Sequence, residues 1–221
     1  MGCLGGGAVP TIEGIDEILT DVTQKIVDIK DNFTNDKLLE EKKEILENRH
    51  TKLKDADKSN EAELTKLIKE LNGKDLEIDN KLIKHELDKM QKIYEIGLEY
   101  ADILKDKLLK QLQKKADSAI VKRQIEQIKK YSPAEFLNSP FGKPLKDLLA
   151  KQGLSNTVLK GYIEELTQER AKRRKEEREE FGIKVNEYPD EELYDALKKD
   201  LFQEMMEETG KNYVSKLIGQ S

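Results

Sequence analysis

The sequence predicts an all-α protein: an elongated helical bundle or coiled-coil-like hairpin around one long central helix, with a smaller C-terminal helical region. The first observation is composition, because 38% of the 221 residues are charged, only 36% are hydrophobic and none is Trp. The second is that apolar residues recur at steps of three and four along most of the chain. Such chains form long helices that each bury one apolar stripe.

We expect three parts along the chain. Residues 1–10 form a Gly-rich, flexible lead, and residues 11–131 form the long-helix bundle or hairpin. Residues 132–221 form the C-terminal helical region, which has a Pro-rich corner and an acidic tail.

The first predicted helix covers residues 12–33, where apolar side chains repeat at helical spacing and acidic side chains lie between them. The polar residues at 32–36 predict a break. A second helical pattern continues over residues 38–71 but thins between Glu47 and Glu63, where we expect a solvated, frayed helix or a loop. Asn72 with Gly73 is the kind of pair that ends a helix.

The central helix is predicted from residue 74 to about residue 130, a stretch that contains no Pro and one Gly. Its apolar side chains form a heptad-like row from Ile83 to Leu108 with a second row beside it, so we expect it to touch two or more other helices. Gly97 and Ala101 lie four residues apart and would let one neighbour approach closely.

The second half of this helix is basic, because nine Lys and Arg outnumber three Asp and Glu between residues 105 and 130. An anionic lipid surface, an acidic or phosphorylated protein such as a filament, or the acidic C-terminal segment of this chain could face it. The last of these is the simplest. The candidate partner-binding residues are Lys107, Lys110, Lys114, Lys115, Lys122 and Arg123.

The C-terminal region opens with a capping box at residues 132–135 that has Pro at its first helical position. Two further Pro residues divide the following segment into two short helices that end near residue 153. Phe136 and Phe141 are candidate partner-binding residues in this segment. The alternative is that the segment is a corner that folds the bundle back on itself.

A further helix is predicted from Ser155 to about Phe181. Its charged run at residues 168–180 mixes both signs and has no core, so we expect a solvated helix supported by ion pairs between residues three or four apart. Gly182 ends this helix, and an acidic, one-sided apolar helix is predicted over residues 189–210.

The N-terminus offers two acceptors for fatty acyl chains, the amine of Gly2 and the thiol of Cys3. The opening Met-Gly-Cys-Leu-Gly resembles the acylated N-terminus of G-protein alpha subunits of the stimulatory class, which implies palmitoylation of Cys3. The resemblance covers five residues. Because no phosphate-binding loop follows, it carries only the acylation. Because no Lys or Arg precedes Lys25, the segment has no basic patch, and stable anchoring would need both lipids. Residue 6 is Gly where the myristoylation consensus has Ser or Thr, which argues against myristoylation of Gly2.

The sequence also argues against several classes of protein. A net charge of -5 is not that of a general nucleic-acid binder, and the chain lacks an apolar segment long enough for a signal peptide or a membrane span. His50, His85 and Cys3 do not make a metal site. No catalytic constellation is present, so we expect no enzyme activity, no metal and no cofactor.

These observations predict a lipid-anchored peripheral membrane scaffold or adaptor that presents helical protein-binding surfaces. The alternative is a soluble coiled-coil component of a cytoskeletal or ciliary assembly, and the third interpretation is a helical bundle that inserts into membranes. We expect protein partners, a homo-oligomer among them, and membrane contact through N-terminal acylation. The expected location is the cytoplasm, including the cytosolic face of a membrane.

Overall fold

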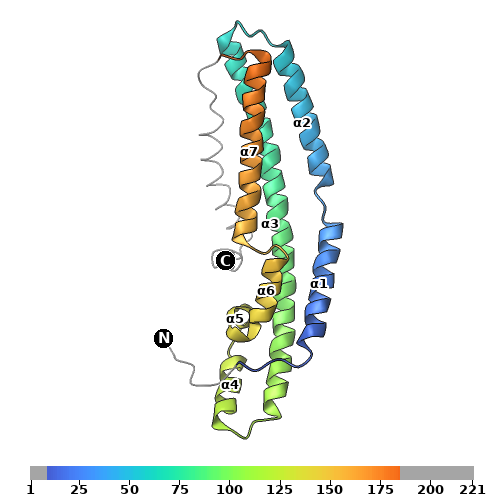
Figure 1. The fold of residues 1–221 in the computed structure, drawn as a ribbon, viewed down its shortest axis with the longest axis vertical. Helices are drawn as coiled ribbons and strands as arrows, with labels where there is room; N and C mark the ends of the chain where they lie inside the picture. The colour runs from blue at the N-terminus through green and yellow to red at the C-terminus, as the bar shows by residue number, and fades with distance from the viewer. Residues whose placement is uncertain (1–8, 185–221) are drawn as a thin grey trace. The chain divides into compact units, whose positions relative to one another are not determined.

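The fold is all-α, as predicted. The computed structural model describes residues 9–184, and all regular structure in that range is helical (Figure 1). The elements in chain order are α1 (Ile15–Asn32), α2 (Asp36–Asp55), α3 (Glu61–Gln113), α4 (Ala119–Lys129), α5 (Pro133–Asn138), the 3₁₀ helix η1 (Pro140–Gly142), α6 (Lys143–Lys151) and α7 (Asn156–Phe181). The predicted helix over residues 189–210 lies outside the described residues.

The long central helix is present as α3, but both of its predicted ends are wrong. α3 begins at Glu61 and continues through Gly73 without a break. The reason is that the core extends on both sides of this glycine: Leu71, Asn72 and Asp75 are all buried. A Gly inside a helix costs about 1 kcal/mol relative to Ala, which packing of the flanking turns offsets.

α3 ends at Gln113, and a turn separates it from α4. Ser118 caps α4, because its hydroxyl accepts a hydrogen bond of 3.2 Å from the amide of Val121. The turn lies beyond Leu108, where the spacing of the apolar row of α3 changes from alternating three- and four-residue steps to four-residue steps. Ile120, which extends that row in the sequence, is 63% exposed and is not part of the core. The predicted continuous helix to residue 130 is therefore a helical hairpin.

By its contacts the chain divides into two compact units. The described part of unit 1 comprises residues 9–32 and 89–155, and that of unit 2 comprises residues 33–88 and 156–184. α3 supplies residues to both. This division differs in kind from the sequence-based one at residues 10 and 131, which stays a prediction.

Unit 1 is built on the second part of α3, against which α1, α4 and the short helices pack. α6 approaches α3 at Gly97, because a Cβ atom there would overlap a methyl group of Leu149. Ala101 is fully buried one turn further on. The predicted close approach of a neighbouring helix is confirmed.

The segment after α4 is a corner of unit 1. The capping box is confirmed: the hydroxyl of Ser132 accepts from the amide of Glu135 at 3.2 Å, and the carboxylate of Glu135 accepts from the amide of Ser132 at 3.5 Å. The rings of Phe136 and Phe141 stack with centroids 6.4 Å apart, and both are buried. These two residues therefore belong to the core, which does not support their predicted role as a partner-binding surface.

Unit 2 contains α2, the first part of α3 and α7, which lie side by side (Figure 1). An apolar cluster joins the end of α2, the start of α3 and the residue after α7's closing glycine. Its buried members are Leu53, Leu64, Ile68, Leu71 and Ile183. Gly182 has a φ of 61°, so α7 ends at a left-handed glycine as predicted.

We predict that Gly73→Ala stabilises the protein by about 1 kcal/mol, because Gly73 is inside a helix and has open space where a Cβ would lie. The free energy of unfolding from urea titration measures this. Gly182→Ala is the matched control with the opposite sign, since its left-handed backbone disfavours a Cβ by about 1 kcal/mol. A loss of stability in Gly73→Ala would instead place a helix end at residue 73.

Candidate functional site

A cluster of buried charges lies inside unit 2. Asp75 and Asp79 are four residues apart on α3, so they share one face of the helix, and both are fully buried. Isolated carboxylates in such a place would be strongly destabilising, so the cluster depends on cations from the neighbouring helices.

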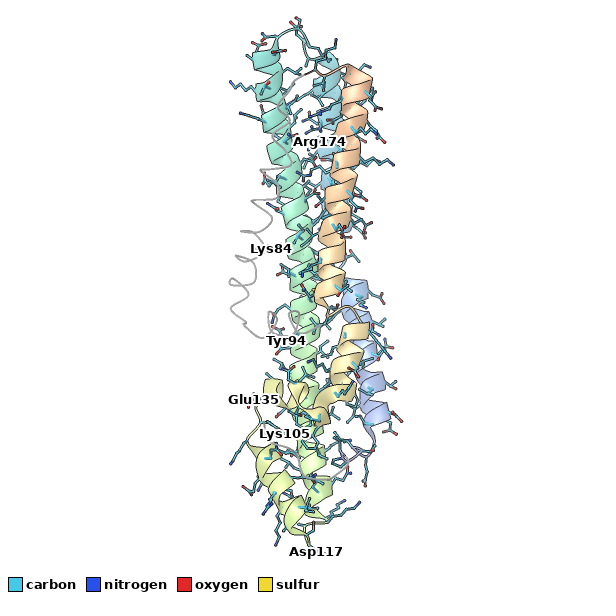
Figure 2. All side chains as sticks on the ribbon, turned by 60° about the vertical axis from the view of Figure 1, so that its left-hand side comes forward. Lys84, Tyr94, Lys105, Asp117, Glu135 and Arg174 are labelled. Atoms are coloured by element: carbon cyan, nitrogen blue, oxygen red, sulfur yellow. The ribbon has the colours of Figure 1, made fainter. Side chains whose placement is uncertain are left out.

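α7 supplies guanidinium groups to this cluster. Arg170 donates to the carboxylate of Asp79 at 2.6 Å and to the backbone carbonyl of Asp75 at 3.2 Å. Arg174 donates to the carboxylate of Asp75 at 2.8 Å, and Arg173 reaches both oxygens of that carboxylate at 3.3 Å. Figure 2 labels Arg174, on the side of α7 that faces α3.

α2 adds a lysine and a second, separate ion pair. Lys42 is buried and donates to Asp79 at 2.9 Å, so this carboxylate binds cations from two helices. Arg49 is 1% exposed and holds Glu177 of α7 in a two-pronged contact with distances of 2.6 and 3.0 Å. The cluster, named here the charged core, comprises Lys42, Arg49, Asp75, Asp79, Arg170, Arg173, Arg174 and Glu177.

The charged core keeps Asp75 ionised. Burial raises the pKa of its carboxyl, but the three guanidinium groups of α7 together lower the pKa by more than burial raises it. The pKa therefore lies below its ordinary value of 3.8. A carboxylate of this kind is a poor proton donor at neutral pH. These ion pairs fix the register of α2 and α7 on α3, because a shift of either helix along its axis would separate buried cations from their carboxylates.

The predicted solvated run at residues 168–180 is wrong for its inner face. Arg170 and Arg174 are only 3% and 5% exposed, because they continue the stripe of Leu159, Ile163 and Leu166 at helical steps. The sequence contains a sign of this burial, because basic residues occupy positions of the apolar stripe of α7 and acidic residues occupy positions of the apolar stripe of α3. Hydrophobicity alone does not find such pairs.

An open groove lies between α2 and α7 next to the charged core. Its volume is about 620 Å³. It is lined by Leu39, Lys42, Lys43, Leu46, Glu47, His50, Thr51, Glu169 and Arg173. The exposed Leu39 gives it an apolar contact surface beside charges of both signs. Such a surface suits a protein side chain better than it suits a small ligand that must be fully enclosed.

The predicted basic residues lie on the hairpin formed by α3 and α4 in unit 1. All six are exposed: Lys107, Lys110, Lys114, Lys115, Lys122 and Arg123. Lys105 closes the hairpin, because its ammonium donates to the backbone carbonyls of Lys129 and Tyr131 at the end of α4 (Figure 2). Four of these residues, Lys114, Lys115, Lys122 and Arg123, lie in or near the turn of the hairpin, whereas Lys107 and Lys110 lie further along α3.

The chain enters unit 1 beside this hairpin. The side chain of Gln111 donates to the carbonyl of Thr11 at 2.8 Å and accepts from the amide of Glu13 at 2.9 Å. A hundred residues of sequence separate these partners, so sequence spacing contains no sign of the contact. Gly2 and Cys3, the predicted lipidation residues, lie outside the described residues.

Residues 9–184 contain no helix that is long and apolar enough to span a bilayer. Within the same range no three His, Cys, Asp or Glu side chains are grouped so as to hold a metal ion. The two histidines contact aromatic rings: His85 stacks on Phe33 at 4.2 Å, and His50 lies 5.2 Å from Phe181.

Comparison with protein-family models, with curated proteins and with solved structures finds no match to this chain.

We predict that Asp79→Asn costs about 3–5 kcal/mol of unfolding free energy, because Lys42 and Arg170 would keep their buried charges without their carboxylate. Urea titration measures this. The control is Asp106→Asn, which breaks the exposed pair with Lys110 and should cost no more than about 1 kcal/mol. Equal effects in the two variants would contradict the role of the charged core.

The charged core also predicts acid sensitivity. Because the folded-state pKa of Asp75 is below the unfolded value, the stability that this carboxylate provides is fully present above the unfolded pKa and is lost as pH falls through the folded pKa. We expect the urea midpoint of the wild type to fall more steeply below about pH 4 than that of Asp75→Asn. Parallel curves would show that Asp75 does not bind protons on unfolding.

Proposed function

We propose that this protein is a lipid-anchored peripheral membrane scaffold. Acyl chains on Gly2 and Cys3 would hold the N-terminus to a cytosolic leaflet, and the helical surfaces would bind protein partners. The observation that carries the proposal is the pair of acyl acceptors at the start of a lead that joins unit 1 at a defined place, next to Gln111.

The length of the lead supports this arrangement. Eight residue steps separate Cys3 from Thr11, which is the first residue of the described range with a hydrogen bond to α3. An extended chain of that length reaches about 29 Å at most. A lipid on Cys3 would therefore keep the hairpin end of unit 1 within this distance of the bilayer surface.

Two acyl chains are needed because one chain binds membranes only weakly and reversibly. The lead itself has no Lys or Arg, and the start of α1 is acidic. Neither segment provides local attraction to an anionic leaflet. The proposal therefore uses both acceptors.

The groove between α2 and α7 is the proposed partner surface. It combines an exposed leucine with lysine, glutamate and histidine side chains, and Lys42 and Arg173 connect it to the charged core. Side chains that are fixed by ion pairs with the charged core keep the shape of the groove constant for a partner.

We predict that the protein isolated from its native cell carries an acyl mass that hydroxylamine removes from Cys3. In membrane fractionation, Cys3→Ser and Gly2→Ala should each reduce the membrane-bound share, by about tenfold or more where one chain is lost, because a single chain binds marginally. Intact mass and fractionation measure the two effects together.

Gly7→Ala is the matched control, since it changes a glycine of the same lead and leaves both acceptors and residue 6 of the myristoylation consensus in place. It should fractionate as the wild type does. An unmodified protein that stays in the supernatant would contradict the anchor and favour a soluble component of a helical assembly.

A further inference from the structure

We infer that the turn end of the α3–α4 hairpin is a second membrane-contact surface, which binds the headgroups of anionic lipids beside the point where the N-terminal lead joins unit 1. The inference rests on the proposed function in one respect, because it assigns the hairpin to the same membrane that the acyl chains would reach. The surface is defined by Lys114, Lys115, Ile120, Lys122 and Arg123 and is named here the hairpin tip.

The hairpin tip has an excess of positive charge. It carries four exposed cations, and the only acidic residue between the first and the last of them is Asp117. Figure 2 labels Asp117 at the turn. α4 has no acidic residue in its first turn. Anionic headgroups would supply the missing negative charge.

The four cations are not used within the described part of the chain. Further from the turn, Lys110 pairs with Asp106 at 2.9 Å and Lys129 with Glu126 at 3.9 Å. None of the hairpin-tip cations forms an ion pair with another residue between 9 and 184. Within residues 9–184 these four cations therefore have no counter-charge.

One large apolar side chain stands among these cations. Ile120 is 63% exposed, the largest exposed fraction among the described large hydrophobic residues. An exposed isoleucine with Lys and Arg on both sides in the sequence matches the boundary between headgroups and acyl chains, where cations meet phosphate and an apolar side chain enters the hydrocarbon. A protein partner would need a pocket shaped for this side chain, whereas a bilayer needs none.

The acidic start of α1 lies back from the tip. Gln111 holds Thr11 and Glu13, and Gly14 lies beside the ammonium of Lys107, with 3.9 Å between a Cβ at Gly14 and that nitrogen. Lys114 is seven residues beyond Lys107, which is about 10 Å along the helix axis. The carboxylates of α1 therefore screen Lys107 more than they screen the tip.

Position gives the argument for lipid over the other anionic partners. The lead joins α3 only three residues before Lys114, so an acyl chain on Cys3 would bring this surface to the bilayer. A basic patch adds electrostatic attraction to the binding that acyl chains provide. The lead has no such patch in the sequence, and the fold provides one.

The test uses the full-length, unacylated protein made in bacteria, with Ile120→Trp as a reporter, because the chain has no Trp of its own. The probes are vesicles of phosphatidylcholine alone and vesicles with a third of phosphatidylserine. We expect a blue shift of Trp emission only with phosphatidylserine, and its loss at high salt. Neutralising the four cations to Gln should weaken apparent vesicle affinity by about six hundredfold, since each cation near the surface contributes about fivefold.

Two matched controls separate the hairpin tip from general effects. Val158→Trp places the reporter at an exposed apolar residue of α7, and it should show no shift. Lys66, Lys69, Lys172 and Lys175 changed together to Gln remove the same charge from exposed positions of unit 2, and this variant should bind as the unneutralised reporter protein does. Circular dichroism on each variant checks that the helices remain.

A second arm couples Cys3, the only cysteine, to a maleimide-bearing lipid in the same vesicles, so that anchoring no longer depends on native acylation. Three outcomes would each overturn the inference. They are the absence of a shift at residue 120 in both arms, a shift at residue 120 already present without vesicles, and an equal shift at residue 158. A shift with phosphatidylserine in a protein whose native form carries no acyl group would support the hairpin tip and contradict the acyl anchor.

Discussion

The pairing of two buried aspartates with the guanidinium groups of α7 is the constraint on which unit 2 depends. Asp75 and Asp79 are fully buried, so their charges are tolerable only while Arg170, Arg173, Arg174 and Lys42 remain in place. An apolar seam could slide by one helical turn at modest cost, whereas a slide here would leave charges unpaired in a poorly hydrated interior. The charged core therefore selects one register of α2 and α7 on α3, and it gives the groove between those two helices a defined shape.

Unit 1 is held together by different means. Its packing is apolar, with α6 seated against a glycine of α3 and with two stacked phenylalanines in the corner. Polar contacts act at its edges: Lys105 closes the hairpin on the end of α4, and Gln111 fixes the entry of the chain. These edge contacts do not involve the cations at the turn end of the hairpin, which form no ion pair with any residue from 9 to 184. The proposed membrane role uses this division between an apolar inside and a basic tip.

Sequence patterns predicted several elements correctly for a local reason. The capping box at residues 132–135, the glycine that ends α7 and the break before α2 depend on side chains within a few residues of each other. The ends of α3 were predicted wrongly because the same residue types allow two outcomes. Asn72 and Gly73 end a helix when exposed to solvent, but here the core continues past them. Ser118 caps a helix only where the preceding chain turns.

By itself the sequence determined the all-α class, several helix boundaries and the charge of each segment, because helical periodicity and caps are encoded over a few residues. Only the tertiary structure decided which charges are buried, since the burial of Arg170 requires carboxylates from a helix about ninety residues away. Only the tertiary structure brought the N-terminal lead to the basic hairpin, through a contact between Thr11 and Gln111. Contacts between distant segments depend on the packing of whole helices, and no local pattern contains that information.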